Sequence, residues 1–210
     1  MPPESFAVRP RALIARADVA MIEGDRDRAL ALYQSAAPLA KETGDRDVEA
    51  ESLRGQAYLA RRAGDFEKAV ELASAALELA PDLHFLRARC FNVIGLCRFN
   101  SSQDTNAAIE SWRAALAEAR NAGDDRFARI VLHNLGLPYS MEGDLNEVIH
   151  WISQMIEARS DGSAQSSLQE QSAPFPQEAI AHLNLARLKI AQGRLDEADQ
   201  HLELALERCR

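Results

Sequence analysis

The stretch from Ala50 to Pro81 reads AESLRGQAYLARRAGDFEKAVELASAALELAP. It consists of two segments rich in alanine and leucine, separated by Gly64-Asp65. Glycine tolerates the left-handed backbone conformation that ends many helices, and the aspartate after it can accept hydrogen bonds from the free N–H groups of the next helix. A connection this short makes the two helices antiparallel. The stretch therefore predicts a helical hairpin.

The same turn recurs along the chain at a nearly constant interval. Gly-Asp pairs begin at Gly24, Gly44, Gly64, Gly123 and Gly143, with steps of 20, 20, 59 and 20 residues. Within the 59-residue step, Pro81-Asp82 and Gln103-Asp104 fall near the two turns that are missing. The segments between the turns have apolar residues at helical spacing. This pattern predicts five hairpins, at residues 10–43, 47–81, 85–122, 126–159 and 177–209.

The hairpins resemble tetratricopeptide repeats. In the stretch quoted above, the matching positions are Leu53, Ala57, Gly64-Asp65-Phe66, Ala69, Ala76 and Pro81. The resemblance implies an all-α fold, a right-handed α–α superhelix of about five hairpins. The step of about 40 residues exceeds the usual 34 and is similar to the long-helix variant found in bacterial signal-transducing transcription activators.

Small and irregular residues refine this expectation. Ala57, Gly95 and Gly136 on first helices predict a close approach of paired helix backbones. Repeat four departs from the pattern, because Val148 stands where alanine is usual and Pro138 removes a backbone hydrogen bond, which predicts a kink.

Residues 161–176 lack a helical period and predict a mobile loop, and residues 1–9 predict an N-terminal tail before a single domain at 10–210.

Composition limits the kind of protein this can be. The net charge of −8 argues against general nucleic-acid binding, which depends on Lys and Arg. Neither a signal peptide nor an apolar stretch long enough to span a membrane is apparent. The three cysteines Cys90, Cys97 and Cys209 suggest free thiols in a reducing compartment, and we expect a bacterial cytoplasmic protein. Cys90 and Cys97 are seven residues apart, so we expect both in the core.

The sequence shows no set of residues that would carry catalysis. It has no Walker-type glycine loop, no Gly-x-Ser-x-Gly motif and no Cys-x-x-Cys pair. Its carboxylates fall at turns and on the polar faces of helices, where solvated surface is the simplest explanation. We therefore predict no enzyme activity, no cofactor and no metal site.

The resemblance implies that a ligand binds the concave face, which the first helix of each hairpin lines. The positions expected to be exposed there carry basic, polar and aromatic side chains: Arg11, Asp18, Arg54, Tyr58, Arg61, Arg89, Asn92, Phe99, His133, Asn134, Asn184 and Arg187. Basic rims with an apolar floor suit an acidic amphipathic segment of a partner. An equal alternative is that the apolar members of this set only pack against neighbouring repeats.

These observations favour a non-catalytic scaffold that binds a peptide or helix of a partner protein in its concave groove. The alternative is a ligand-sensing or oligomerisation module of a bacterial transcription regulator or signalling protein. Leu202 and Leu206 on the last helix lack an obvious covering element. A homodimer through that helix, a longer native chain and tolerated exposure are the three explanations.

Overall fold

The computed structural model describes residues 5–101, 104–142, 150, 179, 182–183, 185–186, 189–190 and 192–207. Within these ranges every regular element is an α-helix, which confirms the all-α class predicted from the sequence. The chain divides into two compact parts, unit 1 (Met1–Asp124) and unit 2 (Asp125–Arg210).

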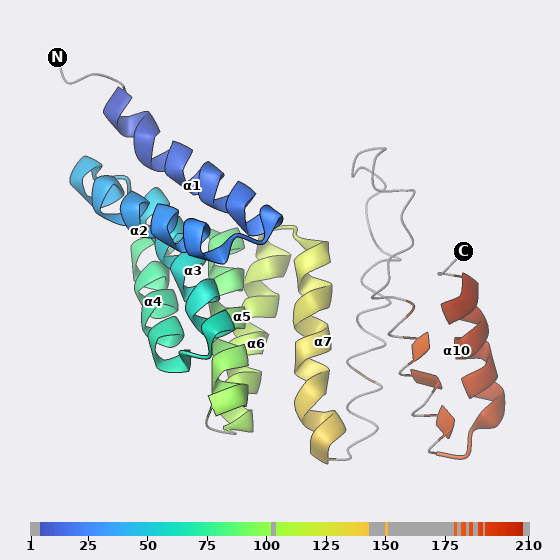
Figure 1. Cartoon of the computed structure of the whole chain (residues 1–210). Helices are drawn as coiled ribbons and strands as arrows, with labels where there is room; N and C mark the ends of the chain where they lie inside the picture. Colours follow the sequence, from blue (N-terminus) through green and yellow to red (C-terminus); the bar gives the residue numbers. More distant parts are fainter. Residues whose placement is uncertain are drawn as a thin grey trace. The chain divides into compact units, whose positions relative to one another are not determined.

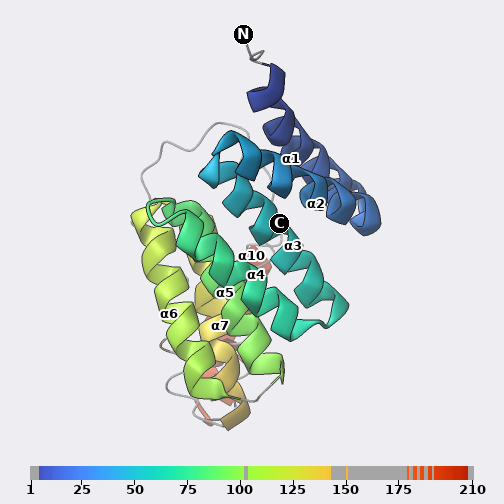
Figure 2. The same cartoon turned by 90° about the vertical axis from the view of Figure 1, so that its left-hand side faces the viewer.

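Unit 1 contains three helical hairpins in sequence order. They are α1 (Ser5–Glu23) with α2 (Arg26–Thr43), α3 (Arg46–Ala63) with α4 (Phe66–Leu79), and α5 (His84–Ser101) with α6 (Thr105–Asn121). Each of these helices packs against the next one along the chain, as Figures 1 and 2 show. Unit 1 is therefore a stack of helical hairpins.

The turn between α3 and α4 shows why the helices end at Gly-Asp pairs. Gly64 has a left-handed backbone, with φ of 86°, and its N–H donates to the carbonyl of Arg61 at 3.1 Å. The Asp65 carboxylate accepts a hydrogen bond from the backbone N–H of Lys68 at 3.1 Å. One pair of residues thus ends α3 and caps the start of α4. The same capping bond is made by Asp25, Asp45 and Asp104.

The first helix begins at Ser5, inside the stretch that the sequence predicted as a tail. Pro10 lies within α1 and is fully buried. Pro10 is the sixth residue of α1, so it lacks the N–H that would donate a hydrogen bond to the preceding turn, although its fixed φ suits the helical backbone. Burial of its ring offsets part of that loss.

Two glycines on first helices make room for a large aromatic ring. A Cβ atom at Gly55 would lie 2.5 Å from the ring of Tyr33, and one at Gly95 would lie 2.6 Å from Nε1 of Trp112. Tyr33 is 2% exposed and Trp112 is 0% exposed, so both rings belong to the core. Gly95 therefore accommodates an indole ring, a more specific role than the close backbone approach predicted from the sequence.

The first and second helices of unit 1 pack differently. The first helices contact one another, since α1 packs against α3 and α3 against α5. The second helices α2, α4 and α6 have no comparable packing against each other. In a curved stack the helices that lie closest together line the inner side. We call the side of α1, α3 and α5 the inner face, and the side of α2, α4 and α6 the outer face.

Unit 2 is described in part. The helices within its described residues include α7 (Asp125–Glu142) and α10 (Leu195–Glu207), and α10 follows a turn at Gly193 with φ of 74°. Pro138 is fully buried inside α7, which is a single helix on both sides of it. Lys189 forms an ion pair of 2.9 Å with Glu197 of α10. Val148, the predicted loop at 161–176 and Cys209 lie outside the described residues.

Candidate partner-binding groove

The structure distributes the predicted groove residues over both units. Eight of them lie on the first helices of unit 1: Arg11 and Asp18 on α1, Arg54, Tyr58 and Arg61 on α3, and Arg89, Asn92 and Phe99 on α5. His133 and Asn134 lie on α7 of unit 2, whereas Asn184 and Arg187 lie outside the described residues. Most of the predicted groove residues therefore lie on the inner face of unit 1.

Two of the predicted arginines already have a carboxylate partner within unit 1. Nε and Nη2 of Arg11 donate to Oδ2 of Asp45 at 3.1 and 2.9 Å. Nη2 of Arg89 donates to Oδ2 of Asp124 at 2.9 Å. Both charges are therefore engaged within the chain.

Asp18 is also engaged. The hydroxyl of Tyr33 donates to Oδ1 of Asp18 at 2.5 Å, and the hydroxyl of the buried Ser52 donates to the backbone carbonyl of Tyr33, also at 2.5 Å. Burial, together with the hydrogen bond to Asp18, raises the pKa of Tyr33 far above its ordinary value. This chain of bonds joins α1, α2 and α3 and fixes the Asp18 carboxylate at the inner face.

Three further predicted residues are mainly packing groups. Asn92 and Asn134 are only 9% and 8% exposed. Phe99 packs against Trp112, with ring centroids 5.6 Å apart and planes tilted by 55°. Little of these side chains is available to a partner, because helical neighbours already cover them. For Phe99 the structure supports the packing alternative stated above.

Arg54 and Arg61 are different. Both are half-buried on α3, and neither Nε atom has a hydrogen-bond partner in the part of the chain that the structure describes. No carboxylate among those residues lies within ion-pair distance of either guanidinium. The Arg61 guanidinium lies 5.3 Å from the centre of the Tyr58 ring. The inner face thus carries two cationic side chains that are not neutralised within the described chain.

The two thiols of α5 are buried, so the prediction that Cys90 and Cys97 belong to the core is confirmed. Burial raises the pKa of Cys90 to about 12, and the charge of Arg54 opposes that rise. Burial raises the pKa of Cys97 to about 11, opposed by the charge of Arg61.

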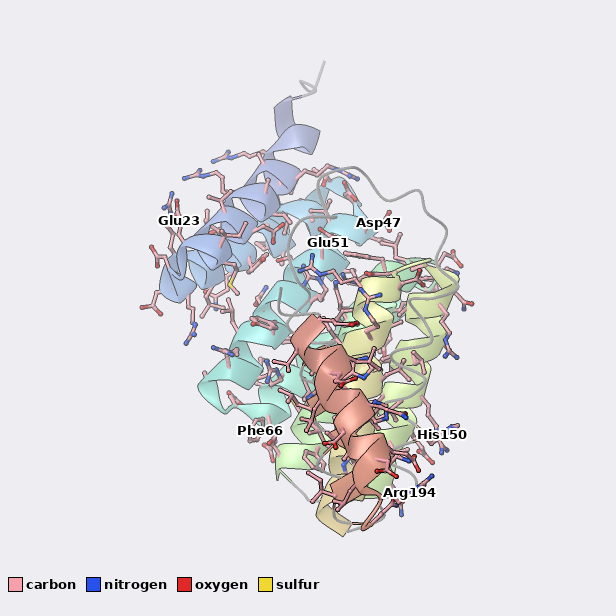
Figure 3. All side chains as sticks on the ribbon, turned by 90° about the vertical axis from the view of Figure 1, so that its right-hand side faces the viewer. Glu23, Asp47, Glu51, Phe66, His150 and Arg194 are labelled. Carbon is pink, nitrogen blue, oxygen red and sulfur yellow. The ribbon has the colours of Figure 1, made fainter. Side chains whose placement is uncertain are left out.

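A pocket of about 450 Å³ opens between α1 and α3 on the same face. Its apolar lining includes Ile14 and Val48, each 5% exposed. Its polar lining includes the carboxylates of Asp18, Asp47 and Glu51. Asp47 and Glu51 are one turn apart on α3 (Figure 3). Arg11 is the one cationic residue among those that line this pocket, so its lining is mainly acidic. Arg54 and Arg61, which are basic, do not line it.

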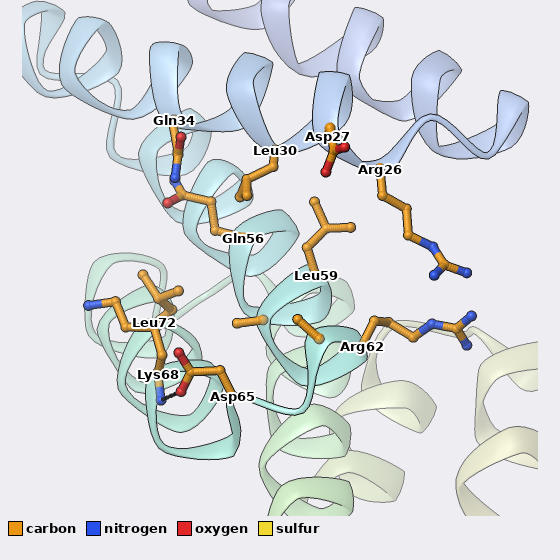
Figure 4. A pocket seen from close by; sticks show the side chains of 12 residues that line it. Arg26, Asp27, Leu30, Gln34, Gln56, Leu59, Arg62, Asp65, Lys68 and Leu72 are labelled. Atoms are coloured by element: carbon orange, nitrogen blue, oxygen red, sulfur yellow. Dashed lines mark hydrogen bonds between the residues drawn. The ribbon is translucent and has the colours of Figure 1, made fainter.

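Sequence reasoning missed a second pocket, of about 380 Å³, between α2, α3 and α4 (Figure 4). Leu30, Leu59 and Leu72 line it, one from each helix, together with Arg26 and Arg62. It was missed because the resemblance directed attention to first helices only. The sequence did contain a signal for this pocket. Leu30 and Leu72 lie on two second helices, each beside a small core residue, as Leu30 follows Ala29.

A stack of helical hairpins with a lined inner face defines a helical-repeat protein. The tetratricopeptide repeat family matches residues 9–82 and, through a second model of that family, residues 179–203. The chain carries tetratricopeptide repeats, as the resemblance predicted, and its fold is the right-handed α–α superhelix of that family.

Solved structures of other helical-repeat proteins have a similar fold. BtubC (BKLC) from P. vanneervenii is 22% identical, with a TM-score of 0.72 over 91% of this chain and 76% of that one. MamA is 20% identical, with a TM-score of 0.60 over 91% and 93%. The TPR-like repeats of a kinesin light chain from Podosopora anserina are 17% identical, with a TM-score of 0.67 over 95% and 94%. At these identities the likeness concerns the fold alone.

Among curated protein sequences, none matches this chain significantly. None of the described helices is both long and apolar enough to cross a membrane. Within the described ranges, no three His, Cys, Asp or Glu side chains gather in a way that could hold a metal ion.

Proposed function

We propose that this chain is a non-catalytic scaffold that binds an acidic amphipathic segment of a partner protein along the inner face of unit 1. The observation that carries this proposal is the pair of half-buried arginines, Arg54 and Arg61, without a carboxylate partner in the described chain. A guanidinium offers a planar fork of donors that fits a carboxylate. Leaving such a group partly buried and unpaired costs free energy, which a bound carboxylate would recover.

The spacing of these groups describes the segment they would bind. Arg54 and Arg61 are seven residues apart, two turns of α3, which separates them by about 10 Å along the helix. Tyr58 lies between them and supplies an amphipathic ring suited to an interface. A bound segment would place two carboxylates about 10 Å apart, as at positions i and i+7 of a helix, with an apolar side chain between them.

A partner-capture experiment tests this function. The double variant Arg54→Glu, Arg61→Glu should lose the partners that the tagged wild-type chain captures. The matched control is Arg16→Glu, Arg113→Glu, which makes the same charge change at two exposed residues that line neither pocket. Mass spectrometry identifies the captured proteins, and circular dichroism checks that each variant is folded. If the inner-face variant captures the same proteins as the wild type, the groove is not the binding site.

A homodimer through the last helix is a second proposal with its own observation. Leu195 and Leu206 of α10 are 61% and 62% exposed. They are eleven residues apart, so they lie on one face of the helix, and Leu202 lies on that face too. Light scattering should give a molar mass about twice the 23.2 kDa of one chain, and Leu206→Glu should return it to one chain. A single-chain mass for the wild type at high concentration would exclude the dimer.

A further inference from the structure

The outer face of unit 1 holds the pocket between α2, α3 and α4, which the proposed function does not use. The second helices do not pack against each other, and this leaves part of α3 open between them. Leu59 of α3 forms the base and is 6% exposed. Leu30 of α2 and Leu72 of α4 are half-buried at its sides (Figure 4). Three leucines from three helices thus make an apolar recess that opens to solvent.

The charged residues around this recess are unequally engaged. The Asp65 carboxylate caps α4 through the backbone N–H of Lys68, and Nζ of Lys68 lies 2.9 Å from Oε2 of Glu71. Arg26 and Arg62, by contrast, have no side-chain partner in the described chain. Among the charged groups around the recess, the guanidiniums of Arg26 and Arg62 are therefore the main ones that a bound molecule could contact.

Both arginines line the recess. Figure 4 shows Arg26 and Arg62 at the same end of it, with their side chains extending to the same side. Like charges in this arrangement repel, and an anion between them removes the repulsion and gains hydrogen bonds. Two acidic residues, Asp27 and Asp65, line the recess. Asp65 caps α4, whereas Asp27 makes no capping bond and lies on α2, as Figure 4 shows.

We infer that this outer recess is a second docking site for a partner protein. The partner segment inserts a leucine or isoleucine side chain between Leu30, Leu59 and Leu72 and places a nearby aspartate or glutamate between Arg26 and Arg62. The volume of about 380 Å³ is at the small end of ligand-binding pockets and suits one anchoring side chain. The charge complementarity selects a carboxylate-bearing segment over a basic one.

The recess shares no lining residue with the inner-face groups Arg54, Tyr58 and Arg61. Its function therefore does not depend on the inner face, and the two can be tested separately. A chain with both sites can hold two segments at once, one on each side of the same hairpins.

The test uses a random-peptide phage library selected on the immobilised full chain carrying Arg54→Glu, Arg61→Glu, so that inner-face binding is disabled. The enriched peptides should combine a leucine or isoleucine with a nearby acidic residue. Adding Arg26→Glu, Arg62→Glu should weaken their binding about tenfold or more. Peptides with lysine in place of the acidic residue should then bind that charge-reversed chain better than the original peptides do.

A second variant, Leu72→Glu, should abolish binding of the same peptides by filling the recess with a charge. Arg26 and Arg62 are exposed, so the charge-reversed chain keeps the fold even if Leu72→Glu does not. The inference is overturned if no peptide is enriched. It is also overturned if the enriched peptides bind the charge-reversed chain as tightly as the starting one.

Discussion

Gly95→Ala should destabilise the protein, although alanine is the better helix former. The added Cβ would lie 2.6 Å from Nε1, 2.7 Å from Cδ1 and 2.9 Å from Cε2 of Trp112. The indole is 0% exposed, so it has no free space into which to move. Overpacking of this kind costs about 1–3 kcal/mol, and the gain in helix propensity is about 1 kcal/mol. The net loss expected is up to about 2 kcal/mol of unfolding free energy.

Gly136→Ala is the matched control. Gly136 also lies inside a first helix and is buried, but no atom of the described residues that could meet the Cβ of an alanine there lies within 4 Å of it. This variant should therefore gain up to about 1 kcal/mol. Urea unfolding followed by circular dichroism measures both variants. If Gly95→Ala is as stable as Gly136→Ala, the close contact with Trp112 does not limit this position.

A double-mutant cycle separates the contact from other effects. Trp112→Leu removes the ring that the new methyl group would meet, at its own cost in packing. Gly95→Ala should then cost less in this background than in the wild type, because the steric term is gone. An equal cost in both backgrounds would refute the reasoning.

Two further predictions concern ionisable groups. Burial raises the pKa of Glu118, but hydrogen bonds from Arg87 and His84 lower it more, so the pKa is below its usual value. A carboxylate whose pKa is lowered in the folded state stabilises the fold above the ordinary glutamate pKa, and this stabilisation is lost as pH falls through the folded-state pKa. Glu118→Gln should therefore lower the free energy of unfolding by about 1 kcal/mol at pH 7 and by little near pH 3. Urea unfolding at the two pH values measures both. Burial raises the pKa of Cys97 to about 11 and that of Cys90 to about 12. At pH 8 a thiol reagent should therefore react in the folded chain about a hundredfold more slowly with Cys97, and about a thousandfold more slowly with Cys90, than in urea. A chain lacking its third cysteine isolates this signal, and equal rates in the two conditions would contradict the burial.

The repeat could be predicted from the sequence because its signals are local. A Gly-Asp pair such as Gly64-Asp65 determines both the end of one helix and the cap of the next within a few residues. The start of α1 at Ser5 was missed for the opposite reason. Its continuation through Pro10 depends on burial against other helices, which a local pattern does not contain.

The groove was predicted as a set of positions, but the roles of its residues required distances between helices. Arg11 and Arg54 look equivalent in the sequence, as basic residues on first helices. The structure separates them, because Arg11 lies 2.9 Å from Asp45 whereas Arg54 has no carboxylate partner in the described chain. One signal was present: Arg11 and Asp45 are 34 residues apart, and Arg89 and Asp124 are 35 apart. Nearly the same spacing at two places indicates a contact repeated between hairpins.

A net charge of −8 does not conflict with a preference for acidic segments, because the two effects act over different distances. At physiological ionic strength charges are screened beyond about 8 Å, so the whole-chain charge affects mainly the approach of a partner. Within the groove, a carboxylate would meet Arg54 or Arg61 at hydrogen-bond distance in a half-buried setting, where screening is weaker. Long-range repulsion slows association at low salt, and short-range pairing slows dissociation. Added salt should therefore speed the association of an acidic segment, whereas a site that attracts its partner through net charge would show the reverse.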